Sequence, residues 1–314
     1  MGTRNFRQML ENQWSQGKFV CVGLDSDLVQ IPETAQIPNP KNPESFLGLD
    51  IEATLFTFNS TIVDATKDLV CAYKPNSAFY ESEGDAGLRA LQQTILYIND
   101  VAPQVPVILD AKRADIGNTN TGYVRMAFDF LKADAITIHP YLGAEALQPF
   151  LERKDKGIFV LCRTSNPGAG EFQDREVIMK PNELGVVRST STALGGFGHP
   201  SAWAAPLYRI VAHQVSRVWN KNGNCALVVG ATYPDELREI RGLVGDMPIL
   251  IPGIGAQGGD VEKTVTAGRD SRDQGMIINS SRGIIFASKG ADFAEAARRE
   301  TQKLHNLINQ YRSA

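Results

Sequence analysis

Short, almost entirely apolar segments recur along the whole chain, and each is followed by a polar or glycine-rich turn and then by a longer segment with helical periodicity. Continuous hydrophobicity of this kind is typical of strands that are buried on both faces, as the strands of a parallel sheet are. Eight segments have this character: residues 19–25, 70–74, 105–110, 135–139, 158–162, 225–230, 249–252 and 276–279. Eight units of strand followed by helix predict an α/β fold, the (β/α)8 or TIM barrel with a parallel eight-stranded barrel.

Helical periodicity is clearest in two segments between and after these strands. Apolar residues repeat at intervals of three and four residues in 207–218, and residues 294–311 follow the same pattern. A doubly wound parallel sheet is the alternative fold, although such a sheet usually has fewer strands. The sequence contains no internal repeat and no linker between two cores, so we expect one barrel domain over residues 1–314.

Two connections are longer than the loops that usually join strands to helices in such a fold. One covers residues 26–45 and is rich in proline, and the other covers residues 170–203 and is rich in glycine. Both follow a predicted strand, so we place them at the carboxyl end of the barrel, where barrel enzymes carry their active sites. Each insertion is either surface decoration or a lid over a site, and the sequence leaves both interpretations open.

Composition narrows the class of protein. Of the 314 residues, 43% are hydrophobic, which is too many for a disordered chain, and the formal net charge of −3 argues against nucleic-acid binding through gross charge. The sequence shows neither an apolar stretch long enough to span a membrane nor the apolar core of a signal peptide. Cys21, Cys71, Cys162 and Cys225 lie in predicted strands without CxxC spacing, so we expect buried free thiols and a cytoplasmic protein.

Charged residues stand at the carboxyl ends of the predicted strands. Asp25 ends the first, Lys74 ends the second, and the third ends in Asp110-Ala-Lys112-Arg-Ala-Asp115. Because side chains alternate along a strand, Asp110 and Lys112 should both point into the barrel mouth. Interleaved charges in a dry pocket are costly unless each has a partner. They form either a salt-bridge network that closes the barrel or, as we favour, a site where a lysine donates a proton or stabilises a carbanion.

The seventh and eighth units carry loops suited to an anion. Pro252-Gly-Ile-Gly-Ala-Gln257-Gly-Gly precedes one helix, and Asn279-Ser-Ser-Arg282-Gly precedes another. In barrels of this kind, the loops after strands seven and eight commonly bind phosphate through backbone N–H groups at the start of a helix. The guanidinium group of Arg282 can add a pair of charge-assisted hydrogen bonds to the phosphate. The sequence therefore predicts a phosphate site at this part of the barrel mouth.

Gly253-x-Gly255-x-x-Gly258 also fits the dinucleotide-binding fingerprint. That fingerprint belongs after the first strand of its unit and needs an acidic residue at the end of the next strand, where this chain has Asn279. A metal site is not predicted either, because lysines interleaved with the aspartates would repel magnesium. We therefore expect no cofactor.

Taken together, these motifs resemble the orotidine 5'-monophosphate decarboxylase family, in its longer branch. The resemblance is carried by Asp110-x-Lys112-x-x-Asp115-Ile, by Lys74 before it, and by the Pro-Gly-Ile-Gly-Ala-Gln and Ser-Arg-Gly stretches after it. It covers about residues 23–284 and is interrupted by the two long connections. Asp-x-Lys-x-x-Asp is shared with sugar-phosphate enzymes of the same superfamily, whereas Ser165-Asn-Pro-Gly, Gln257 and Arg282 favour the nucleotide enzyme.

The resemblance implies decarboxylation of orotidine 5'-monophosphate to uridine 5'-monophosphate (UMP), the last step of de novo pyrimidine synthesis, without a cofactor. Lys112 would protonate C6 of the pyrimidine as CO2 leaves, and Asp110 would lie beside the leaving carboxylate. Asp115 and Thr119 would reach into the site of the partner subunit of a homodimer.

The remaining implied roles concern substrate binding. Lys74 and Asp25 would hold the ribose and complete the charge network. Ser165 would contact the edge of the pyrimidine. Gln257 and Arg282 would bind the phosphate, with Pro252 in the same loop as Gln257. Two alternatives stay open. One is a magnesium-dependent sugar-phosphate decarboxylase on the same scaffold, and the other is a non-catalytic phosphate-ligand binding protein, which would not need Lys112 between two acids.

Overall fold

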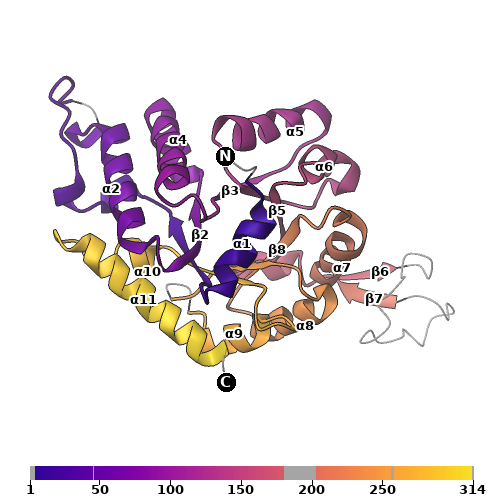
Figure 1. Cartoon of the computed structure of the whole chain (residues 1–314). Helices are drawn as coiled ribbons and strands as arrows, with labels where there is room; N and C mark the ends of the chain where they lie inside the picture. Colours follow the sequence, from indigo (N-terminus) through magenta and orange to yellow (C-terminus); the bar gives the residue numbers. More distant parts are fainter. Residues whose placement is uncertain (1–3, 45, 180–202, 256–257, 313–314) are drawn as a thin grey trace.

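A parallel sheet of eight strands forms the centre of the protein, in the order β2-β1-β10-β9-β8-β5-β4-β3. The structure is a computed structural model that describes residues 4–44, 46–179, 203–255 and 258–312. Isolated bridges pair Tyr73 with Val107 and Asn76 with Asp110, which brings the two edge strands β2 and β3 together. The predicted (β/α)8 barrel is therefore confirmed, and the doubly wound sheet is not what the chain forms (Figure 1).

Every predicted strand is present. The strands of the barrel are β1 (Val20–Leu24), β2 (Val70–Pro75), β3 (Ile108–Arg113), β4 (Ala135–Ile138), β5 (Gly157–Arg163), β8 (Cys225–Val229), β9 (Ile249–Ile251) and β10 (Met276–Ser280). The largest difference concerns β3, which was expected at 105–110. Pro106 has no N–H to donate to a ladder and takes part only through its carbonyl, which accepts from Tyr73 N, so regular pairing begins later.

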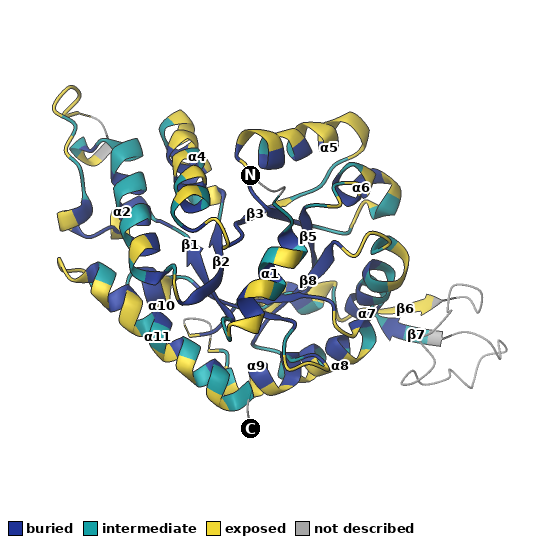
Figure 2. Cartoon of the chain, in the orientation of Figure 1, coloured by how far each residue is buried: buried dark blue, intermediate teal, exposed yellow. Residues whose placement is uncertain are grey.

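Helices surround the barrel with their buried faces turned toward it (Figure 2). They are α1 (Phe6–Ser15), α2 (Ile51–Thr66), α3 (Ala78–Glu81), α4 (Gly84–Val101), α5 (Gly117–Val124), α6 (Gly143–Leu151), α7 (Leu207–His213), α8 (Pro234–Val244), α9 (Val261–Gly268), α10 (Arg282–Ile285) and α11 (Phe293–Arg312). The side chains of Asn5, Asp50 and Asp260 cap α1, α2 and α9 by accepting backbone hydrogen bonds. The expected helix 207–218 is α7 continued by a π-helix, η8 (Gln214–Trp219), and 294–311 is α11.

Helix α1 covers the amino end of the barrel. Trp14 Nε1 donates to the carbonyl of Met276 at 2.8 Å, and the ring of Phe6 packs edge-on against Phe159. A Cβ atom at Gly157 would lie 2.4 Å from the Phe6 ring, so glycine is needed there for this close approach. Because α1 closes the amino end, a ligand reaches the barrel interior from the carboxyl end.

The interior of the barrel is apolar, and buried residues of the strands and helices form one large hydrophobic cluster. Cys21, Cys71, Cys162 and Cys225 are free and buried, as expected, and burial raises the pKa of each thiol. None of the helices in the described ranges is long and apolar enough to cross a membrane.

The two long connections differ in structure. The first contains the 3-10 helices η1 (Leu28–Gln30), η2 (Glu33–Ala35) and η3 (Phe46–Gly48), and it is tied to α2 by a hydrogen bond from Ile37 N to Thr54 Oγ1. The second begins with η5 (Pro167–Glu171) and forms an antiparallel pair, β6 (Glu176–Met179) with β7 (Trp203–Pro206), which projects from the side of the barrel (Figure 1). Its middle part, 180–202, lies outside the described residues.

Candidate active site

A cavity of about 430 Å³ opens at the carboxyl end of the barrel. Most of the site residues expected from the sequence line it: Asp25, Lys74, Asp110, Lys112, Ser165, Pro252 and Arg282. Asp115 and Thr119 do not line the cavity, and Gln257 lies outside the described residues. Since these side chains come from strands far apart in the sequence, the barrel is what brings them together.

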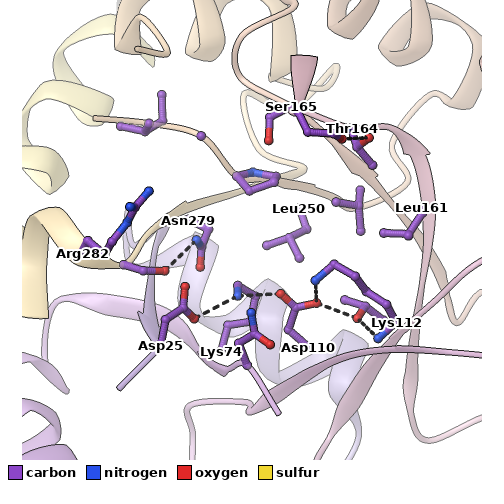
Figure 3. Close-up of a pocket in the computed structure, with 18 of the residues that line it drawn as sticks. Asp25, Lys74, Asp110, Lys112, Leu161, Thr164, Ser165, Leu250, Asn279 and Arg282 are labelled. Atoms are coloured by element: carbon purple, nitrogen blue, oxygen red, sulfur yellow. Dashed lines mark hydrogen bonds and ion pairs between the residues drawn. The ribbon is translucent and has the colours of Figure 1, made fainter. Parts of the chain in front are cut away.

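Acidic and basic side chains alternate along one wall of the cavity (Figure 3). Lys74 Nζ lies 2.9 Å from Asp110 Oδ2 and 3.7 Å from Asp25 Oδ1. Lys112 Nζ lies 2.7 Å from the other Asp110 oxygen, Oδ1. Each lysine therefore has a carboxylate partner, as the interleaved sequence pattern predicts.

The middle of this row is buried and remains charged. Burial would lower the pKa of Lys74, which is 3% exposed, but Asp110 and Asp25 outweigh burial and raise that pKa above its usual value. Burial would likewise raise the pKa of Asp110, but Lys74 and Lys112 hold it well below its usual range. Both groups are therefore ionised across the neutral pH range.

Lys112 has an unusual backbone conformation. Its φ is +47°, in the left-handed region, where a residue with a side chain stores strain of about 1–3 kcal/mol. The pairing of β3 with β4 is irregular at this point, since Leu109 pairs with Ile136 and Arg113 pairs with Ile138. Asp110 and Lys112 nevertheless both line the cavity, as alternation along the strand predicts, and their side chains meet there although the strand is locally distorted.

Glycine-rich backbone around Gly253 and the side chain of Arg282 also line the cavity. Gly253, Gly255 and Gly258 have φ values of +104°, +78° and +83°, which glycine adopts at little cost. Arg282 begins the short helix α10 and is exposed at the cavity rim, on the side opposite Lys112 in Figure 3. Arg282 therefore lies near the Asp25 end of the row of alternating charges and away from Lys112.

Ser165 and its neighbours form a third part of the cavity wall, after β5. The backbone N–H of Thr164 donates to Gln173 Oε1 at 2.9 Å, and the Thr164 hydroxyl donates to Asn166 Oδ1 at 2.7 Å. A Cβ atom at Gly230 would lie 2.6 Å from Ser165 Cα, so glycine at that position gives the Ser165 backbone room. These contacts fix the turn that presents Ser165 to the cavity.

Comparison with known proteins identifies the family of this chain. The sequence model of the Orotidine 5'-phosphate decarboxylase / HUMPS family matches residues 20–299. The chain belongs to this family. A relative from Ralstonia pickettii, named orotidine 5'-phosphate decarboxylase, is 43% identical over 309 residues, which cover 98% of this chain and 99% of the relative.

Solved structures agree with this assignment. A structure of Leishmania donovani OMP decarboxylase is 32% identical, with a TM-score of 0.73 and 99% of each chain covered. A structure of Leishmania donovani UMP synthase is 35% identical, with a TM-score of 0.77, and our chain spans 57% of it. The resemblance seen in the sequence is thus confirmed, whereas the two alternatives, a sugar-phosphate decarboxylase and a non-catalytic phosphate-binding protein, gain no support from these relatives.

Several residues of this decarboxylase-family cavity were given no individual role from the sequence. The polar ones are Asn76, Thr137, Thr164, Asn166, Gln173, Asn279 and Ser281, and the apolar ones include Leu161, Val228, Leu250 and Ile254. Thr137 could have been found as the single polar residue of the strand Ala-Ile-Thr-Ile. Gln173 carries no comparable signal, because it comes from the irregular start of the second long connection.

Asp115 and Thr119 lie beside the cavity and not in it. Asn120 fixes the loop that carries Asp115, since its side chain accepts from Asp115 N at 2.8 Å and donates to the carbonyl of Ala146. The Asp115 side chain is half-buried and accepts from Ile116 N at 2.7 Å, and Thr119 is exposed. Within one chain, neither residue contributes to the row of alternating charges.

The carboxylates of the site do not form a ligand cluster. Within the described ranges, no group of three or more His, Cys, Asp or Glu side chains could hold a metal ion. Asp25 and Asp110 both form ion pairs with Lys74, and its ammonium lies between the two carboxylates.

Proposed function

We propose that this chain converts orotidine 5'-monophosphate to UMP and CO2 in the cavity at the carboxyl end of its barrel. The observation that carries the proposal is the row Asp25–Lys74–Asp110–Lys112, with Arg282 on the side of the cavity opposite Lys112 and Gly253 of the glycine-rich loop in the cavity lining. The name of the Ralstonia pickettii relative supports the same substrate and reaction. We further propose that residues 1–314 act as one barrel domain in the cytoplasm, in pyrimidine biosynthesis.

Decarboxylation of this substrate places a negative charge on a ring carbon with little delocalisation. The bond from C6 to the carboxylate carbon breaks, its electron pair stays on C6, and a proton moves from Lys112 Nζ to C6. A fixed ammonium is suited to both tasks, because it stabilises the developing charge and then supplies the proton. Asp110 lies beside the leaving carboxylate and holds Lys112 Nζ in place.

The other residues bind the parts of the substrate that do not react. Lys74 and Asp25 hold the ribose, Ser165 meets the pyrimidine edge, and Arg282, with Gln257 and Pro252 in the neighbouring loop, binds the phosphate. Because the phosphate lies far from C6, its binding energy serves to order the site, and therefore contributes to the rate as well as to affinity.

The purified chain is expected to decarboxylate orotidine 5'-monophosphate with no added cofactor, as followed by the ultraviolet absorbance of the pyrimidine. We expect dialysis against EDTA to leave this rate unchanged, since ammonium groups supply the positive charge of the site. A rate that falls with EDTA and returns with Mg²⁺ would instead favour a metal-dependent decarboxylase.

Arg282→Ala is expected to raise KM and to lower kcat/KM by about tenfold or more, because it removes a charge-assisted contact to the phosphate. Steady-state kinetics with orotidine 5'-monophosphate measure both constants. Arg238→Ala is the matched control, since Arg238 is an exposed arginine paired with Asp235 on the outer helix α8. An unchanged kcat/KM for Arg282→Ala would rule out the phosphate contact.

We also propose a homodimer in which each chain supplies Asp115 and Thr119 to the other chain's site. Three observations support it. Neither residue lines the cavity of its own chain, and the side chain of Lys112 is 50% exposed when one chain is considered alone. Ile116 and Tyr141, on the loop of Asp115 and on the adjoining segment before α6, are 62% and 88% exposed and offer apolar surface to a second copy.

A further inference from the structure

We propose that Thr137 is a positioning residue of the decarboxylation site, because its hydroxyl group holds the backbone of Lys112 and the carboxylate of Asp110 at the same time. The inference rests on the proposed role of Lys112 as the proton donor. Thr137 comes from the neighbouring strand β4, and no feature of the charge pattern in the sequence pointed to it.

The hydroxyl of Thr137 has two partners. It donates to Asp110 Oδ1 at 2.8 Å and accepts from the backbone N–H of Lys112 at 3.0 Å. A threonine hydroxyl has a single proton, and here that proton is committed to Asp110. Although Thr137 lines the cavity, its hydroxyl is therefore not free to donate to a ligand, and its effect on the reaction passes through Lys112 and Asp110.

The irregular register of β3 against β4 explains why a side chain is needed here. Between the pairs Leu109–Ile136 and Arg113–Ile138, three residues of β3 lie opposite the single residue Thr137 of β4. Lys112 is one of them and has the left-handed φ of +47°. Its N–H donates to the side chain of Thr137, a contact that favours this unusual backbone conformation over the extended one.

Asp110 is fixed through both of its oxygens. Oδ2 receives a hydrogen bond from Lys74 at 2.9 Å, and Oδ1 receives one from Lys112 Nζ at 2.7 Å as well as the one from Thr137. Without the Thr137 hydroxyl, the carboxylate can turn about its last side-chain bond and the backbone of Lys112 can relax. Both changes would move the ammonium away from the position from which it reaches C6, while every charge of the site remains.

Three variants test this inference. Thr137→Val keeps the shape of the side chain and removes the hydroxyl, and we expect kcat to fall by about a hundredfold, since misplacement of a reacting group by about 1 Å has an effect of that order. KM is expected to change much less, because the ribose and phosphate contacts remain. Thr137→Ser restores the hydroxyl and should return kcat to within about tenfold of the wild-type value.

Thr264→Val is the matched control. Thr264 is as deeply buried as Thr137 but lies on α9, and its hydroxyl has no partner within the described part of the chain. We expect this variant to keep the wild-type kcat. Thermal unfolding of all three proteins checks that a change in kcat does not simply report a loss of folded protein.

Wild-type kcat for Thr137→Val would overturn the inference. So would a Thr137→Ser protein that is folded and as slow as Thr137→Val, since the hydroxyl would then not be the determinant. Should Thr137→Val fail to fold, the serine variant still decides, because a loss of kcat well beyond tenfold contradicts the inference. If Lys112→Ala is inactive and Thr137→Val is not slowed, this inference alone fails; an active Lys112→Ala instead refutes the role proposed for Lys112.

Discussion

Lys112→Ala is expected to lower kcat by about four orders of magnitude, while UMP still binds. The substitution removes the proposed proton donor for C6, and with it the ammonium proposed to face the developing negative charge. Each effect alone should lower the rate about a hundredfold or more. The phosphate and ribose contacts are left in place. The decarboxylation rate from pyrimidine absorbance, together with calorimetric titration with UMP, separates the two consequences.

The structure offers a suitable control for this experiment. Lys303 is an exposed lysine on the outer helix α11, and Lys303→Ala should have wild-type kinetics. A kcat of Lys112→Ala within tenfold of the wild-type value would rule out Lys112 as the proton donor, because a tenfold change corresponds to only about 1.4 kcal/mol in activation free energy. Loss of UMP binding along with activity would mean that Lys112 holds the substrate and does not act on C6 alone.

The barrel could be predicted because its strands follow a simple physical rule. A strand covered on both faces must be apolar along its whole length, so segments such as Ala135–Ile138 and Cys225–Val229 are recognisable without any knowledge of their neighbours. The carboxyl ends of such strands meet at one end of a barrel, which is why Asp25, Lys74 and Asp110 could be expected to lie together.

Details that depend on two strands at once could not be predicted in this way. The left-handed conformation of Lys112 follows from how β3 pairs with β4, and the pattern of β3 alone suggested regular alternation. Thr137 is one polar residue in an apolar strand, and its importance becomes visible only when its hydroxyl is found between Lys112 and Asp110. Gln173 enters the cavity from an irregular connection, for which no periodicity exists.

The proposal that Asp115 and Thr119 act in the site of a second chain can be tested by subunit mixing. Lys112→Ala and Asp115→Ala are each expected to be almost inactive as homodimers. A mixed dimer of the two variants contains one site with both substitutions and one site with neither, if Asp115 acts across the interface. Random exchange of subunits makes half of the dimers mixed, so about a quarter of the wild-type activity should return.

The size of this recovery is what distinguishes a shared site from two independent ones. If Asp115 served the cavity of its own chain, every chain in the mixture would carry one defect, and mixing would restore nothing. A mixture of Lys112→Ala with the double variant Lys112→Ala/Asp115→Ala contains no complete site under either arrangement and provides the baseline. Recovery above that baseline therefore means that Lys112 of one chain works with Asp115 of the other, and this would also explain why Lys112 is half exposed in the isolated chain.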